Sequence, residues 1–211
     1  MHDPTATPPH THEVGLAACT SFINTLELDG PDGLPDDHIP TVDQALAFLL
    51  ELDLGHEADL RRQARREGRA WLVRIGDVRA ALREVWDAQV EGRQPTPTSL
   101  ETLNRTLDRG PRVELRGTLA GVAVAHRHPD DDPTGEALAR LAMPLVEAIA
   151  AGDTTRFRIC DNDACRWAFE DASRAGRRRW CDMATCGNRD KVRRFRSRQR
   201  DDVAADAPTE A

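Results

Sequence analysis

The sequence predicts an α+β protein: a mainly helical N-terminal domain with one β-hairpin, followed by a small module that contains four cysteines. Three observations lead to this prediction. Apolar residues recur at helical spacing through most of residues 14–152. Between residues 112 and 128 the period changes to two, because Val113 and Leu115 alternate with charged residues while Val122, Val124 and His126 alternate with Ala and Arg, as in paired strands. Four of the five cysteines then fall within residues 160–186.

Composition divides the 211 residues into four segments. Residues 1–13 are rich in Pro and Thr and are expected to form a disordered tail. Residues 14–152 carry the helical pattern, and residues 154–200 carry the cysteines. Residues 201–211 are acidic and rich in Ala and Pro, so a second disordered tail is expected there. We therefore predict two domains joined by a very short link.

Helical periodicity predicts six helices in the first domain. They cover residues 14–28, Thr41 to just before Gly55, 57–69, 77–91, the stretch after Pro97 up to Gly110, and 134–151. In the first of them Cys19 lies on the apolar face, and we interpret it as a small core residue. The clearest amphipathic helix places one continuous set of residues inward: Val78, Ala81, Leu82, Val85 and Trp86.

The four cysteines have the spacing C-x4-C-x15-C-x4-C, at Cys160, Cys165, Cys181 and Cys186. Two short loops that each supply two thiolates can complete the tetrahedral shell of one structural Zn²⁺. Such a closed shell leaves no position for a substrate. Two disulfides, four ordinary buried thiols, or iron in the same four-cysteine site are the alternatives.

The segments around the cysteines predict a treble-clef-like order of knuckle, hairpin and helix. Trp167 and Phe169 alternate with Arg166, Ala168 and Glu170 as in a strand, and residues 178–181 are expected to return as its partner. After Gly187 and Asn188, a segment without Gly or Pro places Val192 and Phe195 at helical spacing, so we expect both to face this hairpin.

The final helix is strongly basic. Residues 154–200 contain 14 basic and 6 acidic residues, a net charge of +8, whereas the rest of the chain has a net charge of −15. Clustered arginines beside a rigid hairpin are typical of proteins that bind nucleic-acid phosphates, and double-stranded DNA is the partner we expect. The candidate contacts are Arg177, Arg178, Arg179, Arg189, Lys191, Arg193, Arg196 and Arg200.

The segment Cys181–Arg189, preceded by Arg178-Arg179-Trp180, resembles the signature of the CGNR zinc-finger family. The similarity extends to Trp167, Phe169, Asp171, Ser173 and Arg174, and it departs at Ala175, where the family usually has Asn. Members typically join this finger to an N-terminal ABATE domain, and their described role in stress-induced transcriptional regulation is itself a prediction. The resemblance implies Zn²⁺ on the four cysteines, nucleic-acid binding, and an ABATE-like domain over residues 14–152.

Three residues of the first domain are candidates for binding an unknown small-molecule or stress ligand. Asn24 lies in a Phe-Ile-Asn-Thr stretch that resembles the start of ABATE domains, and Asn104 also lies in a family-like context. Arg79 is the first candidate if the ligand is an anion. The alternative for Asn24 is a polar residue that hydrogen bonds to the neighbouring backbone, and the alternative for Arg79 is a plain surface arginine.

Other classes of function have less support in the sequence. No phosphate-binding loop, dinucleotide fingerprint, nucleophile elbow or HExxH motif is present, so we do not expect an enzyme. No apolar stretch approaches membrane-spanning length, and no export signal precedes the domain, so a cytoplasmic protein without membrane contact is expected. A homodimer is possible. The alternative to DNA binding is a zinc-dependent module that docks a protein or binds RNA.

Overall fold

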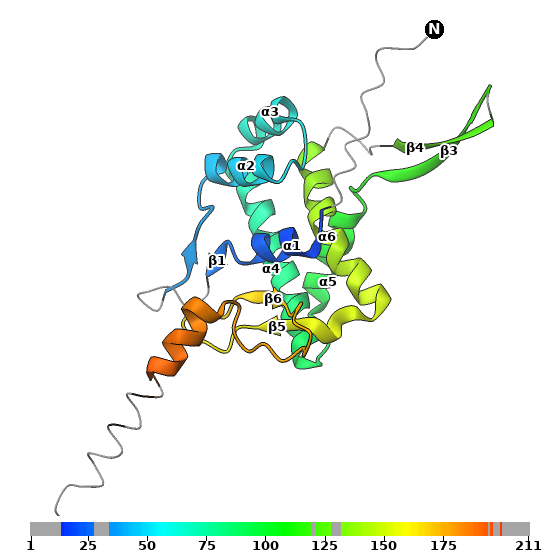
Figure 1. Cartoon of the computed structure of the whole chain (residues 1–211). Helices are drawn as coiled ribbons and strands as arrows, with labels where there is room; N and C mark the ends of the chain where they lie inside the picture. Colours follow the sequence, from blue (N-terminus) through cyan, green and yellow to red (C-terminus); the bar gives the residue numbers. More distant parts are fainter. Residues whose placement is uncertain are drawn as a thin grey trace, which may run out of the picture.

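The computed structural model describes residues 14–27, 34–119, 121–127, 132–193, 195 and 199 (Figure 1). The expected tails, residues 1–13 and 201–211, lie outside these described residues, as do Arg196 and Arg200. The described elements, in chain order, are α1 (Leu16–Ile23), β1 (Leu26–Glu27), β2 (Asp36–Asp37), α2 (Val42–Glu51), α3 (Glu57–Glu67), α4 (Arg69–Glu91), α5 (Pro97–Leu107), β3 (Arg112–Thr118), β4 (Gly121–Arg127), α6 (Pro133–Ala151), η1 (Asp153–Arg156), β5 (Phe157–Ile159), β6 (Ala168–Glu170) and η2 (Met183–Gly187).

Helix α4 is the centre of the fold, because α1, α2, α3, α5, α6 and β5 all pack against it. It begins eight residues earlier than its sequence pattern predicted. Gly68, with φ 55°, separates it from α3, and Trp71 and Ile75 extend its buried side toward the N-terminus. The predicted inward residues are all buried, and so is Cys19 on α1. These side chains form one hydrophobic core, which stabilises the helical domain by removing apolar surface from water.

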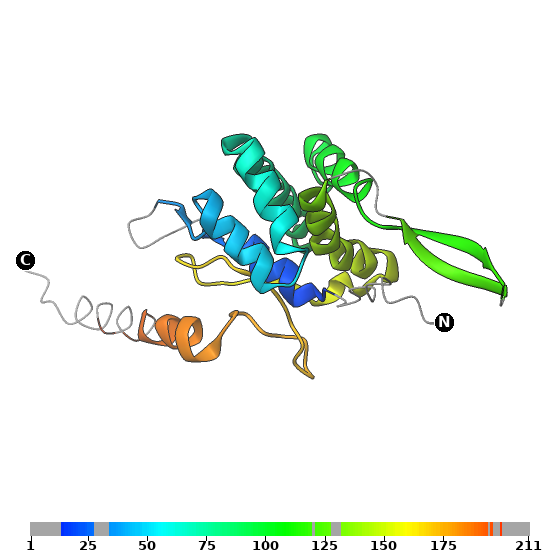
Figure 2. The same ribbon diagram turned by 90° about the horizontal axis from the view of Figure 1, so that it is seen from above.

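The described residues form three small β ladders, each of two antiparallel strands. The predicted hairpin of the helical domain is present as β3 and β4. A second ladder pairs β1 with β2. Strand β1 lies within residues 14–28, which we predicted as one helix, and that prediction is wrong at its C-terminal end because α1 ends at Ile23. In Figures 1 and 2 the β3–β4 hairpin projects from one end of the helical body, and the C-terminal module lies toward the other end.

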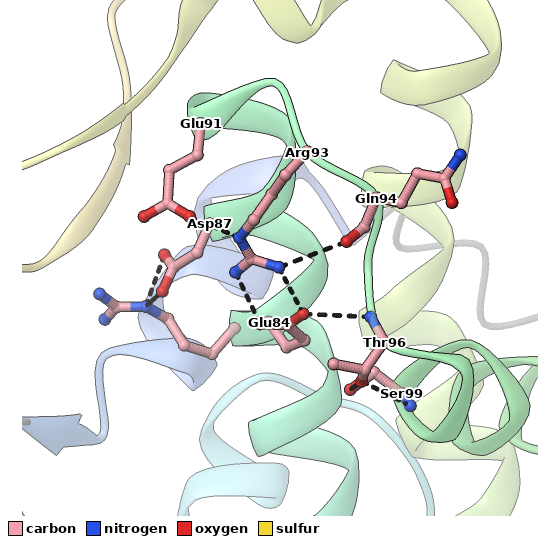
Figure 3. A network of polar contacts seen from close by, with 8 residues as sticks. Glu84, Asp87, Glu91, Arg93, Gln94, Thr96 and Ser99 are labelled. Carbon is pink, nitrogen blue, oxygen red and sulfur yellow. Dashed lines mark hydrogen bonds and ion pairs between the residues drawn. The ribbon is translucent and has the colours of Figure 1, made fainter.

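Polar contacts fix the turn between α4 and α5 (Figure 3). Arg93 forms a bidentate ion pair with Glu84, at 2.7 and 2.8 Å, and a third contact with Glu91 at 2.6 Å. Glu84 also accepts a hydrogen bond from the backbone N–H of Thr96, whose own hydroxyl caps α5. The pKa of Glu84 is lowered, chiefly by the hydrogen bond from Arg93. These contacts fix the turn through which the chain passes from α4 into α5.

Candidate metal centre and nucleic-acid interface

The four predicted cysteine ligands lie together. Their Sγ atoms are all within 4.8 Å of one another, with Cys165 and Cys181 at 3.6 Å and Cys181 and Cys186 at 3.7 Å. Tetrahedral Zn²⁺ with Zn–S bonds of roughly 2.3 Å separates its sulfur atoms by about 3.8 Å, so the cluster fits this ion. All five cysteines are free thiols, which makes the disulfide alternative wrong. The chain therefore holds one structural Zn²⁺.

The first two ligands lie at the tip of a hairpin. Strand β5 leads into Cys160, β6 follows Cys165, and the backbone N–H of Cys160 donates to the carbonyl of Trp167 at 2.8 Å. The chain reverses at Arg166, which has φ 54°. Our prediction of a hairpin between the two cysteine pairs is wrong in its pairing: β6 pairs with β5, whereas residues 178–181 form no strand.

The second pair of ligands is positioned by a capped turn. The carboxylate of Asp182 accepts hydrogen bonds from the N–H and the hydroxyl of Thr185, at 2.7 and 2.9 Å, and η2 brings Cys186 to the cluster. Helical residues 188–193 follow directly. The side-chain amide of Asn162 reaches the Sγ of Cys186 at 3.5 Å and so joins the two loops. Sequence reasoning missed Asp182, although an Asp three residues before a Thr at a helix start is a capping signal.

The thiols of the cluster differ in acidity. Burial raises the pKa of the Cys160 thiol to about 11. The hydrogen bond with Cys181 lowers the pKa of Cys165 to about 6 and raises that of Cys181. Without metal, the lowered pKa of Cys165 favours its thiolate, which hydrogen bonds to the neighbouring Cys181 thiol. A bound cation supplies the charge that ionises all four sulfur atoms.

A buried carboxylate organises the turn after β6. Asp171 accepts backbone hydrogen bonds from Ser173 at 3.0 Å and Arg178 at 2.8 Å. Its pKa falls to about 2, chiefly because the Ser173 side chain donates a hydrogen bond to it. Arg156 and Arg158 donate to carbonyl oxygens of the same turn, including those of residues 173 and 176. These two arginines stabilise the turn of the finger, and the periodicity of the sequence did not predict this role.

The hairpin of the finger is part of the main core. Phe157 is buried and stacks on Trp86 of α4, with ring centroids 4.0 Å apart and planes 8° from parallel. The indole N–H of Trp86 donates to the carbonyl of Arg158 at 3.0 Å. On the other side, the indole N–H of Trp167 reaches Glu27 at 3.2 Å. The finger is therefore docked on the helical domain through shared apolar and polar contacts.

Asn24 also joins the two parts. Its side-chain amide donates to the carbonyl of Ala168 at 2.8 Å, and its side-chain oxygen accepts from the N–H of the same residue at 2.9 Å. Both hydrogen-bonding groups of the amide are thus used by strand β6. Asn24 acts as one more partner for that strand, a contact spanning 144 positions of sequence that local pattern cannot reveal.

The other two ligand candidates lie in different surroundings. Arg79 is buried and forms a bidentate ion pair with Asp37, at 2.7 and 2.6 Å, and it also donates to Thr25. It borders an open pocket of about 480 Å³ that Arg69 also lines. Asn104 is exposed on α5 and lies outside this pocket. The structure therefore does not bring Asn24, Arg79 and Asn104 into one site.

Three of the predicted nucleic-acid contacts are engaged within the finger. Arg178 lies over the ring of Phe169 and donates to the carbonyl of Cys181. Arg179 pairs with Asp161 at 2.5 Å. Arg193 pairs with two aspartates, which lie at positions 163 and 190, each at 2.9 Å.

Three other candidates, Arg177, Arg189 and Lys191, are exposed. Among the described residues none of the three has an ion pair. The helix that carries Arg189 and Lys191 also exposes apolar side chains, because Val192 is 48% and Phe195 60% accessible. Our prediction that these two residues face the hairpin is wrong. The described part of this helix thus presents basic and apolar side chains together.

Comparison with protein families agrees with this geometry. Residues 16–152 match the ABATE family model, described as "Putative stress-induced transcription regulator", and residues 156–199 match the CGNR zinc finger. No curated protein matched the chain. Within the part that the structure describes, no helix is long and apolar enough to cross a membrane. The chain belongs to the ABATE family and carries a CGNR zinc finger directly after its ABATE domain.

Proposed function

We propose that this protein is a non-enzymatic transcriptional regulator that binds double-stranded DNA through its zinc finger and the basic helix that follows. The observation that carries the proposal is the opposite charge of the two parts, +8 for residues 154–200 against −15 for the remainder. Duplex DNA attracts the first and repels the second, so the docked finger would be the face turned to the phosphates.

The ion pairs within the finger indicate which of its basic residues are left to contact DNA. Asp161 and Asp163 are paired with arginines, Asp171 is buried, and Asp182 caps a turn, so most acidic groups of the finger are already used. The positive charge of the exposed residues is then left for a partner. We propose Arg177, Arg189 and Lys191 as phosphate contacts, together with Arg196 and Arg200, which lie outside the described residues; Arg178, Arg179 and Arg193 would support these contacts.

The ABATE domain would sense the signal. The open pocket beside Arg79 and Arg69 is the place we propose for a small-molecule or stress ligand, because Arg69 adds a positive charge beside its apolar wall, whereas Arg79 is already paired with Asp37 there. Contacts through Asn24, Trp86 and Glu27 would transmit a change in this domain to the finger. We place the protein in the cytoplasm, where thiols stay reduced and available to Zn²⁺.

Fluorescence anisotropy with random duplex DNA at two salt concentrations tests the DNA proposal. We expect binding of micromolar affinity or tighter that weakens steeply with salt. Replacing Arg177, Arg189 and Lys191 together by Gln should reduce the magnitude of the salt slope by about 2 to 3. The matched control replaces Arg61, Arg65 and Arg66, which are exposed on α3, and should leave binding unchanged.

Two results would contradict the proposal. Stronger competition by single-stranded or folded RNA than by duplex DNA would make the finger an RNA-binding module. No binding to either nucleic acid at low salt would leave it as a module that docks a protein.

A further inference from the structure

The β3–β4 hairpin stands away from the rest of the molecule. Both views show it leaving the helical body as a two-stranded ribbon (Figures 1 and 2). Its strands pair with each other over seven positions, from Arg112 with Arg127 to Thr118 with Gly121. Neither strand has an extended contact with any other described helix or strand. Within the described part of the chain, the ribbon therefore has two free edges and no layer packed against it.

One face of this ribbon is apolar and exposed. Leu115 lies opposite Val124, and Gly117 lies opposite Val122, so these side chains share a face. Leu115 is 74%, Val122 75% and Val124 64% accessible, and Leu119 at the turn is fully exposed. The hairpin thus gathers large apolar side chains on its own surface, although the helical core lies nearby. Such a patch marks a contact surface.

The ribbon also lacks what an isolated hairpin needs. Two strands alone are marginally stable in water, and a third strand or a packed layer is needed for independent stability. The free edges present unpaired backbone N–H and C=O groups that pair readily with another strand. The most economical solution is a strand from another molecule, added to one edge.

The charged residues of β3 indicate that a second copy of β3 fits the β3 edge. Glu114 and Arg116 flank Leu115 symmetrically, on the opposite face of the ribbon. In an antiparallel pair of two β3 strands centred on Leu115, Glu114 of each copy lies opposite Arg116 of the other. Opposite charges at directly facing positions stabilise a sheet. Within one chain the two side chains are 3.4 Å apart, so they are already turned to the same side.

We propose that two copies of this chain pair through their β3 edges, around a two-fold axis at Leu115, to form a four-stranded antiparallel sheet. The arrangement is isologous, as two-fold interfaces are, and it joins Val124, Leu115, Leu115 of the second copy and its Val124 into one apolar row. Pairing through the β3 edge is favoured over pairing through the β4 edge, because residues 121–125 of β4 contain no charged side chain that could fix a register.

Pairing through backbone groups is geometrically available at this position. Every second residue of an antiparallel strand turns its N–H and C=O away from its partner. The register joins Thr118 to Gly121 across a two-residue connection, whose closing pair exchanges hydrogen bonds. Counting back from Thr118, the groups of Leu115 point outward. Each Leu115 would then exchange two hydrogen bonds with the Leu115 of the other copy.

Sedimentation velocity of the full zinc-loaded chain, at protein concentrations up to about 100 μM, tests the proposal. We expect the mass of a dimer. Glu114→Arg alone, or Arg116→Glu alone, places like charges opposite each other twice and should raise the dissociation constant about tenfold. The double variant restores the pairs in reverse and should return the wild-type value. A monomer at the highest concentration, or equal effects of the single and double variants, would overturn the proposal.

Cross-linking tests the register separately. Facing Cα atoms in the proposed pair are about 5.5 Å apart, within the range that a disulfide spans. Leu115→Cys should therefore give a covalent dimer on oxidation of the zinc-loaded chain. Ala123→Cys on β4 is the matched control and should give none, because two further strands separate its symmetry mates. Cross-linking through Ala123→Cys but not Leu115→Cys would show a different edge and overturn the proposed one. The test does not depend on DNA binding.

Discussion

Two hairpins of this protein have similar sequence patterns but different surroundings. Strand β3 alternates apolar and charged residues, β4 alternates Val with Ala, and in the segment that forms β6 two aromatic residues alternate with Arg, Ala and Glu. The β5–β6 hairpin turns Phe157 and Ala168 into the core and carries two metal ligands at its tip. The β3–β4 hairpin leaves Leu115 and Val124 in water. Alternation therefore predicts that a strand has an apolar face, and the rest of the fold decides what that face meets.

Removal of Zn²⁺ should give the largest difference in hydrogen-exchange protection between the finger and the β3–β4 hairpin. Chelation of Zn²⁺ removes the ion that joins the two cysteine loops, so residues 178–193 should lose much of their protection in hydrogen exchange. Strands β5 and β6 should keep part of theirs, because Trp86 and Asn24 hold them. The β3–β4 hairpin should not change. Equal loss across residues 156–193 would show that the metal, and not docking, holds the finger hairpin.

Truncation of Trp86 tests docking directly. Trp86→Ala removes the stack on Phe157 and should lower the free energy of unfolding by roughly 3–5 kcal/mol in guanidinium denaturation. Trp86→Phe keeps an aromatic ring and loses the hydrogen bond to Arg158, so it should cost about 1 kcal/mol. Val124→Ala on the projecting hairpin is the comparison, and at monomeric concentrations it should change stability by less than about 0.5 kcal/mol. A large effect there would mean that its face is covered within one chain.

Loss of the Asn24 amide should have an intermediate effect. Asn24→Ala leaves the N–H and C=O of Ala168 without their partners and should cost roughly 1–3 kcal/mol by the same measurement. Asn104→Ala removes the same chemical group from an exposed site and should cost less than about 0.5 kcal/mol. Equal effects at both positions would contradict the bridging role of Asn24.

Lower pH should weaken zinc binding by the four cysteines of the finger. Because burial raises the pKa of the Cys160 thiol to about 11, this group is protonated at neutral pH in the metal-free chain and must release its proton to bind Zn²⁺. The apparent zinc affinity should thus fall about tenfold for each pH unit below 8 per proton released, as measured by competition with a chromophoric chelator. Affinity independent of pH between 6 and 8 would contradict the assigned protonation of the cluster.

Local features were predicted well from the sequence. The four metal ligands share one site, Cys19 is a core residue, and Thr41, where the second helix was predicted to begin, caps α2 by accepting from the N–H of Gln44. The projecting hairpin also lies where the change of periodicity placed it. Each of these follows from chemistry within a few residues, such as ligand spacing, capping or the side-chain period.

Features that depend on distant partners were missed or misassigned. Nothing near Phe157 in sequence indicates that it stacks on Trp86, and the strand it forms took the place we had predicted for residues 178–181. Arg79 looked like a surface arginine or a ligand contact, whereas Asp37, 42 positions away, neutralises it in the core. Helical spacing placed Val192 and Phe195 on one side without showing that both side chains are exposed among the described residues.

The stack of Phe157 on Trp86 also has a consequence for any DNA target. A finger on a flexible tether can adapt to binding sites at many separations, but this one is seated against α4 by an aromatic stack and hydrogen bonds. In the dimer proposed above, the distance and rotation between the two fingers would then be constants of the fold. The protein would act as a ruler, accepting paired sites of one spacing and phase and rejecting those shifted by half a helical turn.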